Sequence, residues 1–171
     1  MPRLLSILLL CLLVPLCQNC NPSYKFNGSA LNYDIYKTIY ISEFPIRAAL
    51  VYPPLQQTFE NKLQDGIIRQ TRLQTVSTPN SDLEMTGEIT GYSLSPQAVG
   101  TDAYATQTRL TISVRVKYTD RRNEANNIDQ TFSAYRDFPA TEMLTDVQDQ
   151  LCEEISAELV DLIFNATLGN W

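Results

Sequence analysis

Residues Asp82–Asp120 read DLEMTGEITGYSLSPQAVGTDAYATQTRLTISVRVKYTD, and their pattern decides the fold. Apolar or small residues occupy every second position from Leu83 to Gly91 and again from Leu110 to Tyr118. Side chains alternate between the two faces of a strand, so this pattern predicts two strands that are each apolar on one face only. Between them, Ser95–Asp102 contains the proline and glycine that favour a turn. The stretch therefore predicts one long β-hairpin in an antiparallel sheet covered on one side.

A turn centred near Gly100 would set the register of this hairpin. It would place Glu84 opposite Lys117 and Thr86 opposite Arg115, with Glu88 diagonal to Arg115. Cross-strand pairs of opposite charge contribute roughly 0.2–1 kcal/mol each. One interpretation of the polar face is therefore a solvated, charge-paired surface.

A second interpretation concerns the basic residues of the same face. Arg109, Arg115 and Lys117 would form a stripe that binds an anionic ligand, for example a phosphorylated glycolipid. The spacing is compatible with both interpretations, and both remain open at this point.

Composition narrows the function classes. The chain has 171 residues, a net charge of −6 and no histidine. This length suits a single domain, and the negative charge argues against a nucleic-acid partner, which needs a basic patch. The absence of histidine removes the most common acid–base group and metal ligand at neutral pH.

The N-terminus has the features of a secretory signal. Arg3 precedes a short apolar run, Leu4–Leu16, that is too short for a comfortable transmembrane helix. Cys20 follows where bacterial lipoproteins are cleaved and acylated, and Cys17 is the alternative site. We expect residues 1–19 to be a lipoprotein signal peptide, residues 20–36 a lipidated N-terminus and tether, and residues 37–171 a folded α/β domain.

Several shorter patterns predict the remaining elements. Strands are expected at residues 38–44, 73–77 and 128–138, from their β-branched and aromatic content. A helix is expected from Pro54, with an apolar stripe at Leu55, Phe59, Leu63 and Ile67. A last helix is expected to end near Gly169 and to begin with a capping box formed by Thr145 and Gln148. Its expected buried face is made up of Leu144, Val147, Leu151, Ile155, Leu159, Leu162 and Ala166.

The predicted order is β-α-β-β-β-β-α. This order predicts an α+β fold, a two-layer sandwich in which two helices pack on one face of a mixed four- to five-stranded sheet. Cys152 flanks the apolar face of the last helix and is expected to be a buried, unpaired thiol. The other face of the sheet would be open to a partner or a ligand.

No catalytic motif is found in the sequence. Without histidine there is no Ser/His/Asp or Cys/His arrangement, and no phosphate loop, metal-spaced cysteine pair or calcium loop occurs. We therefore expect a binding or assembly protein that is not an enzyme and needs no cofactor or metal.

Several segments resemble the lipopolysaccharide-assembly lipoprotein LptE family as found in Bacteroidetes-type bacteria. The similar segments are Asp82–Tyr92, Arg109–Tyr118, Cys20 with Tyr24–Gly28, Gln57–Phe59, Phe132–Tyr135 and Asn170–Trp171. The residues before Cys20 depart from the usual small-residue pattern of that family.

The resemblance implies a lipid-anchored protein of the outer membrane that faces the periplasm. It also implies that the domain plugs the lumen of a large β-barrel, the LptD translocon, assists assembly of that barrel and aids lipopolysaccharide delivery to the cell surface. No motif transfers ligand contacts residue by residue, so Arg109, Arg115 and Lys117 remain candidates from spacing alone.

A lipid-binding module and a hydrolase are the two alternative functions. A free periplasmic lipid-binding lipoprotein would need a closed apolar cavity. A hydrolase with paired carboxylates would need two acidic groups at a defined separation, and no such pair can be named from the sequence.

Overall fold

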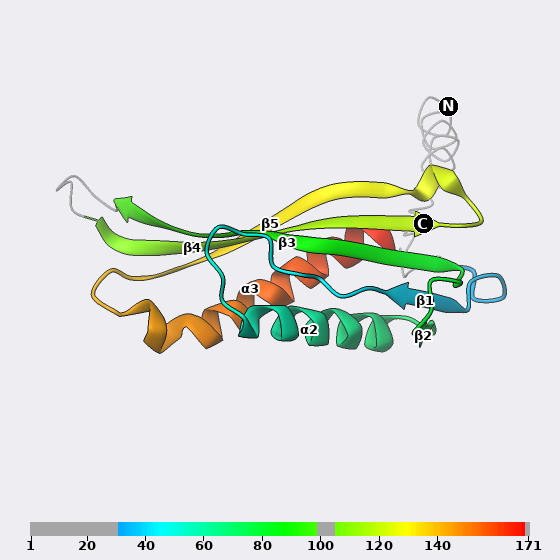
Figure 1. Cartoon of the computed structure of the whole chain (residues 1–171), viewed down its shortest axis with the longest axis horizontal. Helices are drawn as coiled ribbons and strands as arrows, with labels where there is room; N and C mark the ends of the chain where they lie inside the picture. The colour runs from blue at the N-terminus through cyan, green and yellow to red at the C-terminus, as the bar shows by residue number, and fades with distance from the viewer. Residues whose placement is uncertain (1–30, 99–104, 170–171) are drawn as a thin grey trace, which may run out of the picture.

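The computed structural model describes residues 31–98 and 105–169. The expected signal peptide, Cys20 and the tip of the hairpin lie outside these residues. The described chain forms a five-stranded sheet in the order β2-β1-β3-β4-β5. Figure 1 shows the sheet as one layer and both helices on one side of it. The predicted α+β two-layer fold is confirmed, with its elements in the predicted order.

The sheet is mixed. β1 (Thr38–Ile41) lies between β2 (Gln74–Val76) and β3 (Leu83–Ala98) and is parallel to both. β3, β4 (Ala105–Asp120) and β5 (Ile128–Pro139) form an antiparallel meander. A short 3-10 turn, η2 (Glu124–Asn126), lies between β4 and β5.

The expected hairpin register was wrong by two residues. Glu84 pairs with Thr119, Thr86 with Lys117, and Glu88 with Arg115. The reason is that the two strands meet later than expected: Ala98 pairs with Ala105, which moves the centre of the hairpin by one residue and each pairing by two. A shift of two positions leaves each side chain on its predicted face, because the strand repeat is also two.

A β-bulge at Thr90 changes the face to which the following residues of β3 point, so the predicted alternation was wrong beyond Ile89. Ile89 pairs with Val114, and the next pair is Gly91 with Ser113. The extra residue reverses the alternation. Tyr92, expected on the polar face, is consequently buried beneath the sheet, and Gly91 lies on the open side.

The helices cover the inner face. α2 (Pro54–Gln70) begins at the predicted proline and buries all four residues of its predicted stripe. α3 (Leu144–Thr167) buries Leu151, Ile155 and Leu159 as predicted, whereas Leu162 is 40% exposed and Ile163 and Phe164 are buried in its place. The buried face continues from Leu159 by a step of four to Ile163, whereas the prediction took a step of three to Leu162.

The predicted capping box was also wrong. α3 starts at Leu144 after Met143, and no side chain caps its first turn. Thr145 is already inside the helix, where its hydroxyl bonds to the Asp146 carboxylate at 3.2 Å.

Candidate functional site

The sheet surface turned away from the helices, called here the open face, is polar. Odd-numbered residues of β4 and β5 point to it, because the buried residues of both strands are even-numbered: those of β4 from Leu110 to Asp120, and Phe132, Ala134 and Phe138 of β5. Its β4 and β5 residues are Arg109, Thr111, Ser113, Arg115, Lys117, Asp129, Thr131, Ser133, Tyr135 and Asp137. All three candidate ligand residues lie on it, so the tertiary structure brings them to one surface.

Arg109 is held firmly by two neighbours from β5. Its Nε and Nη2 atoms donate to the two Asp137 oxygens at 2.7 and 2.9 Å. Its guanidinium also stacks on the Tyr135 ring, 3.7 Å from the centroid. The hydrogen bonds to Asp137 raise the pKa of Arg109 and lower that of the carboxyl. An anionic ligand would have to share Arg109 with Asp137.

Arg115 has the same arrangement at the other end of the open face. It donates to both Asp129 oxygens, at 2.8 and 2.9 Å, and pairs across the ladder with Glu88. The hydrogen bonds from Arg115 hold the pKa of Asp129 below its usual range. The charge-paired interpretation therefore describes these two arginines, with partners mainly from β5.

Lys117 differs from the two arginines. It is exposed, and among the ion pairs of the described residues none includes it. It lines a shallow depression of about 530 Å³ with Arg115, Glu88 and Asp129. The ammonium of Lys117 is thus the candidate cation most accessible to an anion.

Small hydroxyl side chains separate the two arginine pairs. The Ser113 and Ser133 hydroxyls bond to each other at 2.8 Å, and Gly91 faces Ser113 from β3. A Cβ on Gly91 would lie 2.9 Å from the Ser113 Cβ, so only glycine fits here without a shift. The middle of the open face is therefore flat and rich in hydrogen-bonding groups.

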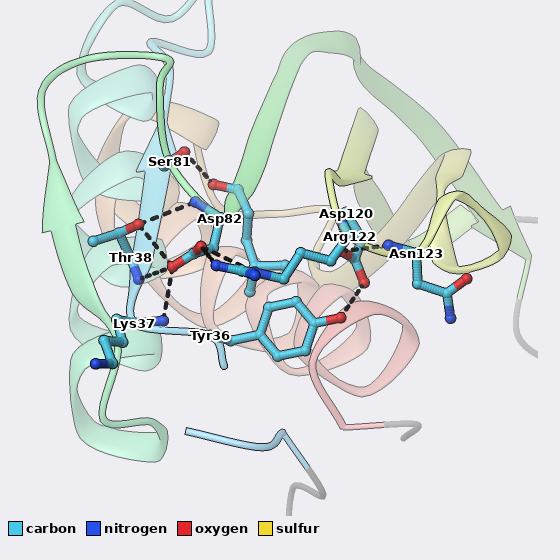
Figure 2. A network of polar contacts seen from close by, with 9 residues as sticks. Tyr36, Lys37, Thr38, Ser81, Asp82, Asp120, Arg122 and Asn123 are labelled. Atoms are coloured by element: carbon cyan, nitrogen blue, oxygen red, sulfur yellow. Dashed lines mark hydrogen bonds and ion pairs between the residues drawn. The ribbon is translucent and has the colours of Figure 1, made fainter. Parts of the chain in front are cut away.

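A second polar cluster lies where β3 begins and β4 ends (Figure 2). Asp82 accepts hydrogen bonds from the Lys37 and Thr38 amides at 2.9 and 3.1 Å, and from Arg122 at 2.8 Å. Burial alone would raise the pKa of Asp82, but these donors lower it to about 2. Asp82 thus joins the start of β1 to the turn after β4.

Asp120 is the second carboxylate of this cluster and is fully buried. Its oxygens accept from the Tyr36 hydroxyl at 2.9 Å and from the Arg122 and Asn123 backbone amides at 2.8 and 3.0 Å (Figure 2). They also accept from the side-chain amide group of Asn126 at 2.9 Å. Burial opposes ionisation, but these donors hold the pKa of Asp120 below its usual range. These donors come from the segment before β1 and from the turn and η2 after β4, so Asp120 joins these segments and the cluster is a structural clasp.

Sequence reasoning missed the partners of the candidate residues. The alternation of Asp129, Thr131, Ser133, Tyr135 and Asp137 was a detectable signal for an open-face strand. Which arginine each aspartate would meet depended on the β4–β5 register, which no turn motif specified. Asp82 and Asp120 flank the hairpin in sequence, but their hydrogen bonds to Tyr36, Lys37 and Thr38 depend on where the segment before β1 meets the end of the sheet.

Residues 31–98 and 105–169 also bear on metal binding and on membrane insertion. They contain no group of three or more histidine, cysteine, aspartate or glutamate residues placed to hold a metal. No helix there is both long and apolar enough to cross a membrane. Cys152 is buried and free, as predicted, and burial raises the pKa of its thiol to about 11.

Comparison with protein families identifies the chain. Residues 36–167 match the model of the LptE lipopolysaccharide-assembly family. The chain belongs to the LptE family. No curated protein matches it closely enough to add a function.

Solved structures share the fold of this chain. A lipoprotein B from Nitrosomonas europaea is similar with a TM-score of 0.52 at 15% identity, covering 75% of this chain and 79% of that one. A hypothetical protein from Chlamydia trachomatis gives 0.54 at 10% identity, covering 79% and 99%. A protein from Xanthomonas campestris gives 0.54 at 12% identity, covering 78% and 83%. At these identities the similarity establishes the fold alone.

Proposed function

We propose that this LptE-family chain is a lipid-anchored subunit of an outer-membrane lipopolysaccharide translocon. It would plug and help to assemble a β-barrel partner of the LptD type, and aid delivery of lipopolysaccharide to the cell surface. The family match over residues 36–167 is the observation that carries the proposal.

The open face supports this role physically. Its arginines are paired with aspartates, and serine and threonine hydroxyls lie between them. Such a surface stays hydrated or hydrogen-bonded, and barrels of this kind have a polar interior. The open face suits contact with that interior better than contact with lipid chains.

The proposed anchor is an acylated Cys20. Each buried methylene of an acyl chain contributes about 0.8 kcal/mol to membrane attachment, so several chains anchor firmly. Metabolic labelling with an alkyne-tagged palmitate should label the wild type and the matched control Cys17→Ala, and should not label Cys20→Ala. Loss of label in Cys17→Ala alone would move the anchor to Cys17.

Co-purification tests the translocon role. The lipidated protein would be isolated from detergent-solubilised outer membranes, and its companions identified by mass spectrometry. We expect one large β-barrel protein in stoichiometric amount. Recovery of the chain alone with bound lipid would instead establish the free lipid-binding module.

A further inference from the structure

Within residues 31–98 and 105–169, the edge strand β5 is long, and no described strand pairs with its outer side. Edge strands attract other strands, and proteins protect them by shortness, proline or a covering segment. The edge strand β2 has only three residues, and the outer side of β3 carries Pro96 beyond the segment Ser42–Arg47 that pairs with it. β5, at the other edge, has twelve residues and no proline before Pro139.

The direction of the β5 backbone groups follows from one hydrogen bond beyond its end. The Ala140 amide donates to the Thr106 carbonyl at 3.1 Å, so even-numbered residues bond to β4. Odd-numbered residues then direct their amides and carbonyls outward, because the two kinds of pair alternate in an antiparallel ladder. Arg136 agrees with this, since its Nη1 atom bonds to the Tyr135 carbonyl at 2.8 Å. Asp129, Thr131 and Ser133 precede Tyr135 in β5 and also direct their backbone amides and carbonyls outward.

Side chains of helix α3 lie beneath the outer edge of β5. Arg136 contacts both Glu154 and Glu158, so these carboxylates lie on the β5 side of α3. Leu162, four residues further on, continues the same row and is 40% exposed. Two carboxylates share one guanidinium here, and α3 has six acidic and no basic residues. The ledge under β5, made of Glu154, Glu158 and Leu162, is therefore acidic with an apolar end.

We propose that the outer edge of β5 accepts an extended segment of another protein as a sixth strand, with lysine or arginine side chains facing the acidic ledge. Main-chain hydrogen bonds would supply affinity, and the ledge would select the partner, as in other cases of strand addition. This interaction surface is independent of the proposed function.

A second copy of this chain fits the edge less well. Antiparallel pairing of two β5 strands about Ser133 would place Asp129 of each copy opposite Asp137 of the other. Like charges directly opposite each other destabilise a strand pair. The same pairing would bring two acidic ledges together. Charge complementarity therefore favours a basic partner segment.

A capped ten-residue peptide of alternating lysine and threonine is a suitable probe. It would be titrated into the lipidated full-length protein in non-ionic detergent, with binding and amide exchange followed by NMR. We expect the amides of Asp129, Thr131 and Ser133 to become protected on binding. The control peptide has the same sequence with every backbone amide nitrogen methylated, which removes all main-chain donors, and equal binding of this control would overturn the proposal.

Two pairs of variants make the test specific. Thr131→Pro removes one outward amide while leaving the bonds to β4, and should weaken binding at least tenfold, whereas Thr131→Ala should change it less than twofold. Glu154→Gln with Glu158→Gln should weaken binding severalfold, unlike Glu153→Gln with Asp161→Gln on the α2 side of the helix. Equal effects of the two variants within either pair would contradict the proposal. Amide protection that appears without peptide and rises with protein concentration would also contradict it, because it would indicate that a second copy of the chain binds the edge.

Discussion

At the scale of single residues, the clasp around Asp82 and Asp120 shows how one partly buried and one buried carboxylate can stay ionised. Backbone amides, Tyr36, Asn126 and Arg122 supply the donors that water would otherwise provide. Hydrogen bonds to charged groups contribute about 1.5–3 kcal/mol each when removal leaves a buried partner unpaired. The clasp therefore links the stability of the domain to the ionisation of two side chains.

The first prediction is a pH dependence. A lowered pKa in the folded state means that the stabilisation is complete above the unfolded pKa of about 4 and is lost as the pH falls. For Asp82, whose folded pKa is about 2, the loss should extend from about pH 4 to about pH 2. Urea unfolding at a series of pH values should show this decline in the free energy of unfolding.

The matching variant is Asp120→Asn. Asp120→Asn should reduce the free energy of unfolding by about 1–3 kcal/mol near neutral pH. Both Asp120 oxygens accept hydrogen bonds, and the NH2 group of asparagine would replace one of these acceptors with a donor. The difference from wild type should narrow as the pH falls, since the wild-type carboxylate is then protonated. A constant difference at every pH would show that the ionised form of Asp120 has no special role.

The second prediction concerns Gly87. A Cβ at this position would lie 2.2 Å from the Arg115 carbonyl oxygen and 2.5 Å from the Phe44 ring. Gly87→Ala should therefore destabilise the domain by about 1–3 kcal/mol through overpacking, measured by chemical denaturation. Gly66→Ala is the control, because there only a Val160 methyl must move and the gain in helix propensity, about 1 kcal/mol, offsets the contact.

At the scale of elements, the bulge at Thr90 adjusts β3 to two different environments. Before it, Met85 and Ile89 point to the core, and after it Tyr92 does. The Tyr92 hydroxyl accepts a hydrogen bond from Gln148 of α3 at 2.6 Å, which ties the far half of the hairpin to the helix layer. Without a phase change this tyrosine would lie on the open face.

The third prediction is that deleting Thr90 preserves the fold. Removal of the extra residue leaves Ile89, Gly91 and Tyr92 in regular alternation, with every neighbour on its present face. The melting temperature should change by only a few degrees, equivalent to about 1 kcal/mol in a domain of this size. Deleting Ser93 should cost considerably more, because Leu94 would then turn to the open face. Equal effects of the two deletions would refute this role of the bulge.

At the scale of the whole molecule, the two layers differ in charge. On the open face, Arg109, Arg115 and Lys117 of β4 lie beside Asp129, Asp137 and Glu88, so positive and negative charges nearly balance. α3, in the opposite layer, carries only acidic charges. An anionic glycolipid approaching the domain would therefore be favoured on the open face, and Lys117 is its most accessible cation.

The fourth prediction tests that polarity. Arg115→Glu with Lys117→Glu should reduce binding of the detergent-solubilised protein to purified lipopolysaccharide at least fivefold, while recovery of the barrel partner is retained. Raising the salt concentration should weaken wild-type binding in the same direction, because exposed charges are screened. Arg69→Glu on α2, also exposed, is the matched control and should bind like the wild type. Equal binding by all three proteins would remove Arg115 and Lys117 as ligand contacts.

The sequence by itself determined the elements and their order, the core stripe of α2 and the face of β4 that carries Arg109, Arg115 and Lys117. These properties follow from local periodicity, which depends only on neighbouring residues. Only the tertiary structure decided the strand register, the bulge that buries Tyr92, the aspartates that hold two of the three basic residues and the outer edge of β5, with which no described strand pairs. Each of these features depends on which segments distant in sequence contact one another. The pairing with the lowest free energy is selected by packing of the whole chain and cannot be read from neighbouring residues.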